Sequence, residues 1–434
     1  MKIDARILPL MLCAGMALKA DETLLLAQND AGQEGWFHAK KAGRYTAGRN
    51  EAAELARWAE QSRIDLRLRT LWLDERFASD KTTATAAGGM FGFTTPDVHG
   101  LSGKIEAYTS QKFWGINPSD PAQLNPELYS DGDSFTYIAE AELRYRVGAL
   151  NVRAGRMYLE TPFADPDDIR MAPNTFEGIS ADYGVDARWK VRMMYLTRWA
   201  GFDSSSAQKD FVRFTDDSAG MFSAAVTYES DDAASSVWYY HADRLFDLGY
   251  MEATGKLYIG ASWHLDWGLQ AAQMGELDAS GIEGAVVGAM AMAHWRNLYA
   301  GGAYNYAMVA EGKHVTDGMG GGPYFTSLDE TTVAGASEMA PGHDISVFRL
   351  GGGADVAWWL HDTDSEGLHA EAMYGVFDSK GSDVSVDETD VMLWLALSER
   401  VRLDAVFAHF EVHGHPQSDS EDFDRYWVRA EYGF

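Results

Sequence analysis

The strongest constraint on the fold is an alternation of apolar and polar residues that recurs from Arg63 to the C-terminus. In "YIAEAELRYRV" (137–147), every second residue from Ala139 onward is apolar, and glutamates and arginines stand between them. Successive side chains of a strand point to opposite faces, so this segment would form a strand with one apolar and one charged face. Such a strand is too charged for the core of a soluble protein.

Further segments with this pattern follow one another, and they are joined by two kinds of connection. Some connections are tight, such as 183–190 and 397–402. Others are long and polar, namely 76–99, 112–134, 158–178, 200–219, 310–344 and 413–424. Alternation of short turns with long loops is typical of transmembrane barrels. Two of the expected strands are 255–265 and 354–360.

The sequence therefore predicts an all-β chain whose residues 62–434 form a transmembrane antiparallel β-barrel. At about 10 residues per strand plus connections, this length fits about 18 strands (16–18). A barrel of that size has an aqueous lumen. No apolar run reaches about 18 residues, which excludes a conventional helical membrane protein. Aromatic residues near strand ends, such as Trp263 and Trp267, favour a membrane interface.

The N-terminus predicts export from the cytoplasm. Residues 1–20 have a short charged start, an apolar stretch and small residues near the end, which is the pattern of a secretory signal peptide. The chain's one cysteine, Cys13, lies in this segment, so the mature protein is expected to contain none. Residues 21–61 are expected to form a periplasmic or plug-like segment with a short amphipathic helix around Leu55 and Trp58.

The net charge excludes one class of partner. The formal net charge of −29 repels phosphate backbones, so nucleic acid is not an expected ligand.

The last ten residues, "RYWVRAEYGF", alternate once more and end on Phe434. This segment resembles the terminal strand of bacterial outer-membrane barrels, in which the final aromatic residue is recognised by the barrel assembly machinery. The resemblance implies a location in the bacterial outer membrane, in contact with its lipid and lipopolysaccharide.

Three further segments resemble the outer-membrane porin D (OprD-like) family. They are "LRLRTLWLDERF" at the first strand, "GKIEAYTSQKFWG" in an early hairpin, and "VRAGRMYLETPFADPDDIRMAPNTFEG", in which a strand leads into a loop with an Arg…Pro-x-Thr-Phe pattern. The resemblance implies an 18-stranded barrel, monomeric or loosely trimeric. It also implies a third extracellular loop that folds inward and a row of basic residues on one wall of the lumen.

The resemblance assigns candidate site residues to this loop and this wall. The constricting 158–178 loop would carry Asp165, Asp167, Asp168, Arg170, Pro173, Asn174, Thr175, Phe176 and Glu177. The basic wall would contain Arg67, Arg69, Arg144, Arg146 and Arg153, of which Arg69 matches the family's first strand and the others follow from lumen-facing parity. Opposed rows of acids and arginines would create a transverse field that orients zwitterions.

Three of these aspartates and two histidine-containing groups also contain the residue types that bind metals. Asp165, Asp167 and Asp168 could supply oxygen ligands to Ca²⁺, but a glycine turn and a distal glutamate are lacking. The group His361, Asp362 and Asp364 and the group His409, His413 and His415 contain metal-type ligands without a matching site pattern. We therefore assign no catalytic residue, metal site or cofactor.

The resulting hypothesis is a porin that lets small polar solutes such as amino acids, small carboxylates or peptides diffuse passively, and that is not an enzyme. Two alternatives remain at this stage. One is a secreted all-β carbohydrate-binding or carbohydrate-active protein. The other is a structural or adhesive barrel without conductance.

Overall fold

The computed structural model describes residues 61–113, 115–260, 262–355, 367–415 and 422–434. These residues form a single closed antiparallel sheet of 18 strands, which confirms the predicted barrel. The predicted signal peptide (1–20) and residues 21–60 of the predicted N-terminal segment lie outside the described residues. Within the described residues, no helix is both long and apolar enough to cross a membrane.

The strands follow one another in the ring in chain order. They are β1 (Arg63–Phe77), β2 (Lys81–Thr94), β3 (Leu101–Lys112), β4 (Phe135–Val147), β5 (Leu150–Met157), β6 (Thr175–Gly184), β7 (Trp189–Ala200), β8 (Met221–Glu229), β9 (Ala233–Ala242), β10 (Phe246–Ile259), β11 (Trp263–Glu276), β12 (Gly284–Trp295), β13 (Leu298–Val309), β14 (Ile345–Asp355), β15 (Gly367–Ser379), β16 (Ser385–Ser398), β17 (Val401–His413) and β18 (Phe423–Gly433). The described loops contain the short helices η1 (Pro121–Gln123), η2 (Pro126–Leu128) and α3 (Val333–Met339).

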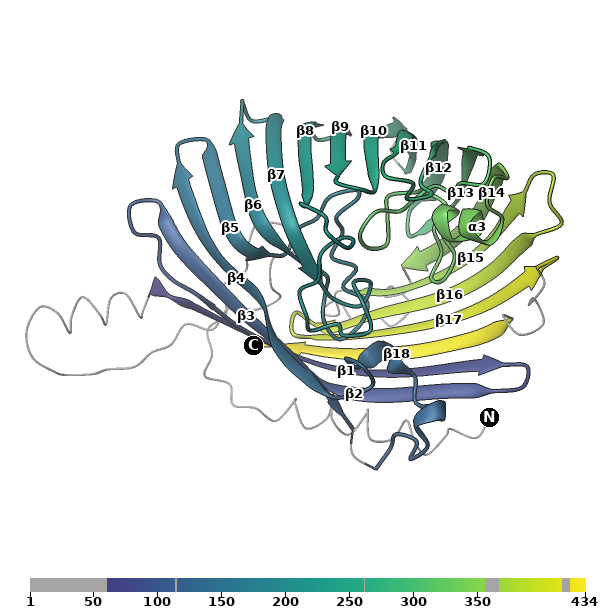
Figure 1. Cartoon of the computed structure of the whole chain (residues 1–434), viewed down its shortest axis with the longest axis horizontal. Helices are drawn as coiled ribbons and strands as arrows, with labels where there is room; N and C mark the ends of the chain where they lie inside the picture. The colour runs from purple at the N-terminus through teal and green to yellow at the C-terminus, as the bar shows by residue number, and fades with distance from the viewer. Residues whose placement is uncertain (1–60, 114, 261, 356–366, 416–421) are drawn as a thin grey trace, which may run out of the picture.

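The barrel closes where the last strand pairs with the first. β18 runs antiparallel to β1 from Arg67 opposite Gly433 to Phe77 opposite Phe423. Figure 1 shows these two strands side by side, the purple β1 against the yellow β18. The Phe434 N–H extends the pairing by donating to the Leu66 carbonyl at 2.9 Å. Closure leaves no free sheet edge, as a barrel in lipid requires.

The two faces of each strand meet different surroundings. On β11, Trp263 and Leu269 are exposed apolar side chains, whereas Gln270 and Met274, at the opposite parity, are buried. The exposed apolar face points outward, where lipid would cover it, and the other face points into the lumen. The alternation that the sequence shows is therefore the alternation between lipid and lumen.

The connections differ between the two ends of the barrel. Because neighbouring strands are antiparallel, all connections that follow odd-numbered strands lie at one end, which we call the long-loop end. The predicted long segments 112–134, 158–178, 200–219, 310–344 and 413–424 follow β3, β5, β7, β13 and β17, so they all lie there. In Figure 1, connecting segments turn into the space that the ring of strands encloses. The other end is the short-turn end.

Three local predictions were wrong or incomplete. The predicted long loop 76–99 contains β2, whose "KTTATAAGGMFGFT" has mostly small residues, so its alternation of apolar and polar residues is weak. The predicted strand 255–265 crosses the turn between β10 and β11, where Gly260 adopts a φ of +74°. Its apolar residues keep the same parity on both sides of the turn, so the alternation gave no sign of it. Of the predicted strand 354–360, residues 354–355 belong to β14 and the rest lies outside the described residues.

Candidate functional site

The connection between β5 and β6, residues 158–174, is packed inside the barrel; we call it the β5–β6 loop. Its Phe163 is fully buried. The ring of Phe163 lies edge-on to Tyr240 of β9, at 5.6 Å between centroids, and to Tyr250 of β10, at 5.4 Å. Edge-to-face aromatic contacts of this kind stabilise a buried site beyond the area that they remove from water. Phe163 therefore anchors the loop to the β9–β10 wall.

The same loop reaches a second wall through Asp168. One carboxylate oxygen of Asp168 lies 2.7 Å from the guanidinium of Arg69, and the other lies 3.1 Å from that of Arg67, both on β1. Arg429 of β18 donates to the Asp168 carbonyl at 2.8 Å. Arg69 also donates to the Arg170 carbonyl. The loop is thus fixed to the β1–β18 wall by charged hydrogen bonds, which are stronger than neutral ones.

These two walls face each other across the barrel. In the closed ring of 18 strands, β10 is nine strands from β1 in either direction. A loop that contacts both β10 and β1 has to cross the space between them. The β5–β6 loop therefore spans the lumen rather than lining its rim.

The β13–β14 loop, residues 310–344, crosses alongside it. The Asp165 N–H donates to the Met319 carbonyl at 2.9 Å, and the Met319 N–H donates to the Phe163 carbonyl at 3.2 Å. The backbones approach so closely that a Cβ at Gly318 would lie 2.6 Å from the Phe163 carbonyl oxygen, and Gly318 has a φ of +83°. Only glycine fits both requirements. The glycine-rich "GMGGGP" segment (318–323) is therefore part of the contact between the two loops.

The folded-back end of the β5–β6 loop is held by its own backbone and by a neighbouring loop. The Asn174 N–H donates to the Pro166 carbonyl at 2.6 Å. The Asn174 amide donates to the Asp203 carboxylate, in the β7–β8 loop, at 2.6 Å. Pro173 is buried in the same stretch. Asp167 adopts a φ of +40°, a left-handed conformation that aspartate tolerates better than most residues.

A second ionic cluster connects this loop to the β3–β4 loop. Arg170 is buried and donates to Glu127 at 2.7 Å. Glu127 also accepts from Arg425 of β18, which in turn donates to Glu75 of β1 at 2.9 Å. The guanidinium of Arg170 lies over the ring of Phe202, 5.0 Å from its centroid. Buried charges of this kind are stable only when they are paired. Removing one charge leaves its partner buried without a counter-charge, which is strongly destabilising.

The pKa values of the two neighbouring aspartates of the loop are shifted in opposite directions. Burial alone would raise the pKa of Asp168, but the charges of Arg69 and Arg67 outweigh burial and hold this pKa well below its ordinary value. Burial, followed by the nearby charge of Asp203, raises the pKa of Asp167 to about 8. Asp168 is thus ionised throughout the neutral range, whereas Asp167 is mostly protonated at pH 7.

The structure brings together only some of the predicted site residues. Thr175, Phe176 and Glu177 belong to β6 and not to the loop, because pairing with β7 begins at Thr175 opposite Ala200. Thr175 and Phe176 are buried, and Phe176 stacks on Trp199 at 6.1 Å. Glu177 pairs with Arg156 at 3.4 Å and with Arg198, so it does not join the aspartates of the loop.

The predicted basic wall divides in the same way. Arg67 and Arg69 contact the β5–β6 loop through Asp168, as described above. Arg153 donates to the Tyr158 carbonyl at 3.0 Å and to Glu142 at 2.8 Å. Arg144 pairs with Glu142, and Arg146 is exposed one residue before the end of β4 at the short-turn end.

Sequence reasoning missed Arg425, Arg429 and Glu127. Arg429 has the same parity as Glu431 in "RYWVRAEYGF", so the alternation had already placed it on the lumen face. Its contact with Asp168 depends on where a distant loop folds, which parity does not predict. The earlier metal candidates are also dispersed: Asp168 faces arginines, His409 pairs with Asp424 at 2.7 Å, and His361, Asp362 and Asp364 lie outside the described residues.

Comparison with known proteins agrees with this architecture. A family model described as "outer membrane porin, OprD family" matches residues 56–296. No curated protein matches the chain. The solved structure of OccK9 (OpdG) from Pseudomonas aeruginosa has a TM-score of 0.71 at 16% identity, with 86% of this chain and 98% of that chain covered.

Two other solved structures are similar to the same extent. OpdK from Pseudomonas aeruginosa, solved with vanillate, has a TM-score of 0.70 at 17% identity, covering 87% of this chain and 99% of that one. OccAB2 from Acinetobacter baumannii has a TM-score of 0.71 at 13% identity, covering 86% and 98%. At such low identity these likenesses show the fold. Nothing in the comparisons supports a secreted carbohydrate-binding or carbohydrate-active protein.

Proposed function

The chain belongs to the OprD family of outer membrane porins, and from this premise we propose that it is a passive channel preferring small carboxylate-bearing or zwitterionic solutes. Its place is the bacterial outer membrane, and its fold is that of porins, which are channels rather than enzymes. In the proposal, the solute passes the point where the β5–β6 loop crosses the lumen. Asp165, Asp167, Asp168, Arg170, Pro173 and Asn174 would form the constriction there, together with the β13–β14 loop.

The observation that carries the solute preference is the way in which Arg67 and Arg69 hold Asp168. Two guanidiniums grip one carboxylate at 2.7 and 3.1 Å, which is the geometry that a carboxylate-bearing solute would need. A solute carboxylate would have to displace the Asp168 carboxylate from these arginines. This competition would keep its binding weak enough for the solute to leave again. That OpdK was solved with vanillate, a small carboxylate, supports the same class of solute.

The overall charge of the crossing point favours solutes with both signs. Arg67, Arg69 and Arg429 stand on one wall, and Asp165 and Asp203 both lie beside Asn174 of the β5–β6 loop. An amino acid could direct its carboxylate to the arginines and its ammonium to the aspartates. The proposal also includes recognition of Phe434 by the barrel assembly machinery. It is compatible with a monomer and with a homotrimer.

Liposome swelling tests the solute preference. Purified protein is reconstituted and challenged with amino acids, small monocarboxylates and neutral sugars matched in size. We expect faster entry of the carboxylates and zwitterions than of the sugars. The double variant Arg67→Gln/Arg69→Gln should remove that advantage while leaving sugar entry intact. Arg192→Gln is the matched control, since Arg192 pairs with Asp182 at 2.5 Å on β6 and β7, away from the loop. Equal rates for all solutes in the unmodified protein would refute the preference.

A further inference from the structure

Three metal-type ligands meet on the lumen wall, outside the contacts described above. His264 and Asp266 lie on β11, and His294 lies on β12 directly opposite His264. His264 and Asp266 have the same parity as Gln270 and Met274, which are buried on the lumen side of β11. His294 is the cross-strand partner of His264, so it shares this face. On the outer face of the same strand pair, Trp263 stacks on Trp295 at 5.8 Å. The cluster is therefore inside the barrel, next to the turn between β10 and β11.

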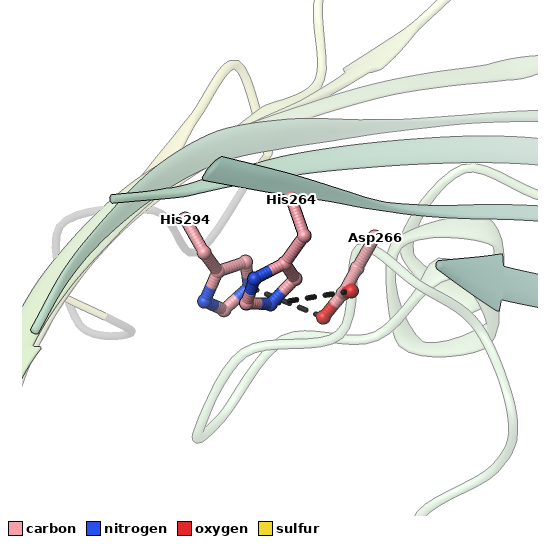
Figure 2. Close-up of side chains that lie close together, drawn as sticks. All are labelled: His264, Asp266 and His294. Atoms are coloured by element: carbon pink, nitrogen blue, oxygen red, sulfur yellow. Dashed lines mark ion pairs between the residues drawn. The ribbon is translucent and has the colours of Figure 1, made fainter. Parts of the chain in front are cut away.

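The three side chains converge. The Nε2 atom of His294 lies 3.1 Å from one carboxylate oxygen of Asp266, and the Nε2 atom of His264 lies 3.7 Å from the other. The candidate ligand atoms all lie within 4.8 Å of one another. Figure 2 shows the two imidazole rings overlapping, with their edges toward the carboxylate of Asp266. About a quarter to a third of each side chain remains accessible, at 31%, 26% and 25% for His264, Asp266 and His294.

Neighbouring rings hold the two histidines in place. The imidazoles stack with centroids 4.3 Å apart and planes inclined by 10°. Tyr258 of β10 flanks His264 at 5.9 Å, and Tyr299 of β13 stacks on His294 at 5.5 Å. Four aromatic side chains from four neighbouring strands thus form one row along the wall. Such packing lowers the entropy that the ligands would lose on binding an ion.

One polar atom in the cluster lacks a hydrogen-bond partner. The Oδ1 atom of Asp266 is buried and accepts no hydrogen bond from the described residues. A buried acceptor without a partner costs free energy that a bound group would recover. Lys256, the cross-strand neighbour of Asp266 on β10, makes no ion pair with it among the described contacts. The unsatisfied oxygen and the two imidazole edges are aimed at the same small space.

We propose that His264, Asp266 and His294 bind a divalent transition-metal ion of the Zn²⁺ class. Two imidazole nitrogens and one carboxylate oxygen suit zinc and related ions, whereas Ca²⁺ and Mg²⁺ prefer oxygen ligands alone. With bonds of about 2.0–2.2 Å, tetrahedral ligand atoms lie roughly 3.3–3.6 Å apart. The two histidine-to-aspartate distances, 3.1 and 3.7 Å, lie just below and just above this spacing, so small side-chain rotations would bring the ligands to it.

The site would be open rather than structural. Three protein ligands leave a fourth position, and that position faces the lumen because the ligands do. A bound ion would therefore exchange with the solution and would add two positive charges to the wall near the short-turn end. This role is separate from the solute preference proposed above, which rests on Arg67, Arg69 and the β5–β6 loop.

Zinc binding can be measured directly on the purified barrel in detergent, without a polyhistidine tag. Titration against a fluorescent zinc indicator should give one competing site per chain. His264→Ala, His294→Ala and Asp266→Asn should each weaken it by about tenfold or more, since even indirect partners of a metal contribute about 10–100-fold. Substituted Co²⁺ should show the visible absorption of nitrogen and oxygen coordination.

His409→Ala is the matched control, because His409 also lies beside carboxylates, Glu411 and Asp424, but on the outward face of β17. It should leave the zinc affinity unchanged. Heat-modifiable migration in a detergent gel shows that each variant is folded, and Asp266→Asn keeps the shape of the site if an alanine variant fails to fold. Zinc binding that survives in all three variants, or the absence of any one-to-one binding in the unmodified protein, would overturn the proposal.

Discussion

At the residue scale, Asp168 illustrates how one carboxylate can set the charge of a wall. It pairs with two arginines of β1 and its carbonyl accepts from a third arginine on β18. Of the predicted basic wall, the part on β1, Arg67 and Arg69, is therefore paired with the loop in front of it. Its charge depends on whether the loop is docked.

The first prediction concerns this pairing. Asp168→Asn should leave Arg67 without its ion-pair partner and Arg69 with Glu431 alone, and should shift the reversal potential in a salt gradient toward anion preference. Breaking a buried ion pair costs about 3–5 kcal/mol, so the loop should also dock less firmly. Planar-bilayer recordings measure both, as ion selectivity and as current noise. Glu177→Gln is the control, because Glu177 pairs elsewhere; an equal shift in that variant would contradict the assignment.

The second prediction follows from the raised pKa of Asp167, about 8 against an ordinary 3.8. Below pH 8 the folded protein keeps most of this carboxyl protonated. The stability that the neutral form contributes is full below about pH 3.8 and is lost as the pH rises from there through 8. The newly formed negative charge should then increase cation preference between about pH 7 and pH 9. Reversal potentials recorded across this range test the idea, and Asp167→Asn should remove the change. A curve that keeps its step in that variant would assign the titration to another group.

At the element scale, the β5–β6 loop is held by three different kinds of contact. Aromatic packing fixes it to β9 and β10, ion pairs fix it to β1 and β18, and backbone hydrogen bonds fix it to the β13–β14 loop. The partners in these three groups lie far apart from one another in the sequence. This distribution is why a loop can cross the lumen without a regular structure of its own.

The third prediction tests the aromatic anchor. Phe163→Ala removes a fully buried ring, and a large-to-small change of this kind typically costs about 3–5 kcal/mol. The barrel should still form, because Phe163 lies in no strand. Single-channel recordings should show a larger or less steady conductance. The matched control is Phe211→Ala, in the β7–β8 loop. Phe434→Ala is unsuitable because Phe434 takes part in the closure of the barrel. A conductance identical to that of the unmodified protein would argue against a crossing anchored here.

The elements themselves could largely be predicted from the sequence, and the site only in part. Alternation between lipid and lumen is a local property, so strands such as β4 and β18 are evident, whereas β2 is hidden by its small residues. The inward loop was expected from a family resemblance and not from its own pattern. Which arginine meets Asp168, and that Gly318 touches Phe163, depend on contacts between distant segments. The histidine cluster was missed for the same reason, because its members join only through the register of β11 and β12.

At the scale of the whole molecule, the barrel separates two solvents. The described outward face is apolar, with exposed side chains such as Met251 on β10, and the inward face contains the buried charges. Stability in the membrane should therefore respond to a new charge according to the face on which it stands.

The fourth prediction compares the two faces of one strand. Met251→Arg places a charge in lipid and should reduce the free energy of unfolding in vesicles by up to about 2–4 kcal/mol, depending on its depth. Thr254→Arg, three positions later and at the opposite parity, should have a much smaller effect. Denaturant unfolding followed by tryptophan fluorescence measures the difference. Equal losses in the two variants would place lipid on both faces, which a lumen does not permit.

The contact between the β5–β6 and β13–β14 loops has a consequence for how the pore fluctuates. Because Asp165, Phe163 and Met319 exchange backbone hydrogen bonds, neither loop can leave the lumen without the other losing partners. Opening events should therefore be cooperative, with abrupt steps between few current levels instead of a graded flicker. A molecule that binds the outer part of the long β13–β14 loop, such as an antibody or a phage protein, could in this way reduce the current without entering the pore.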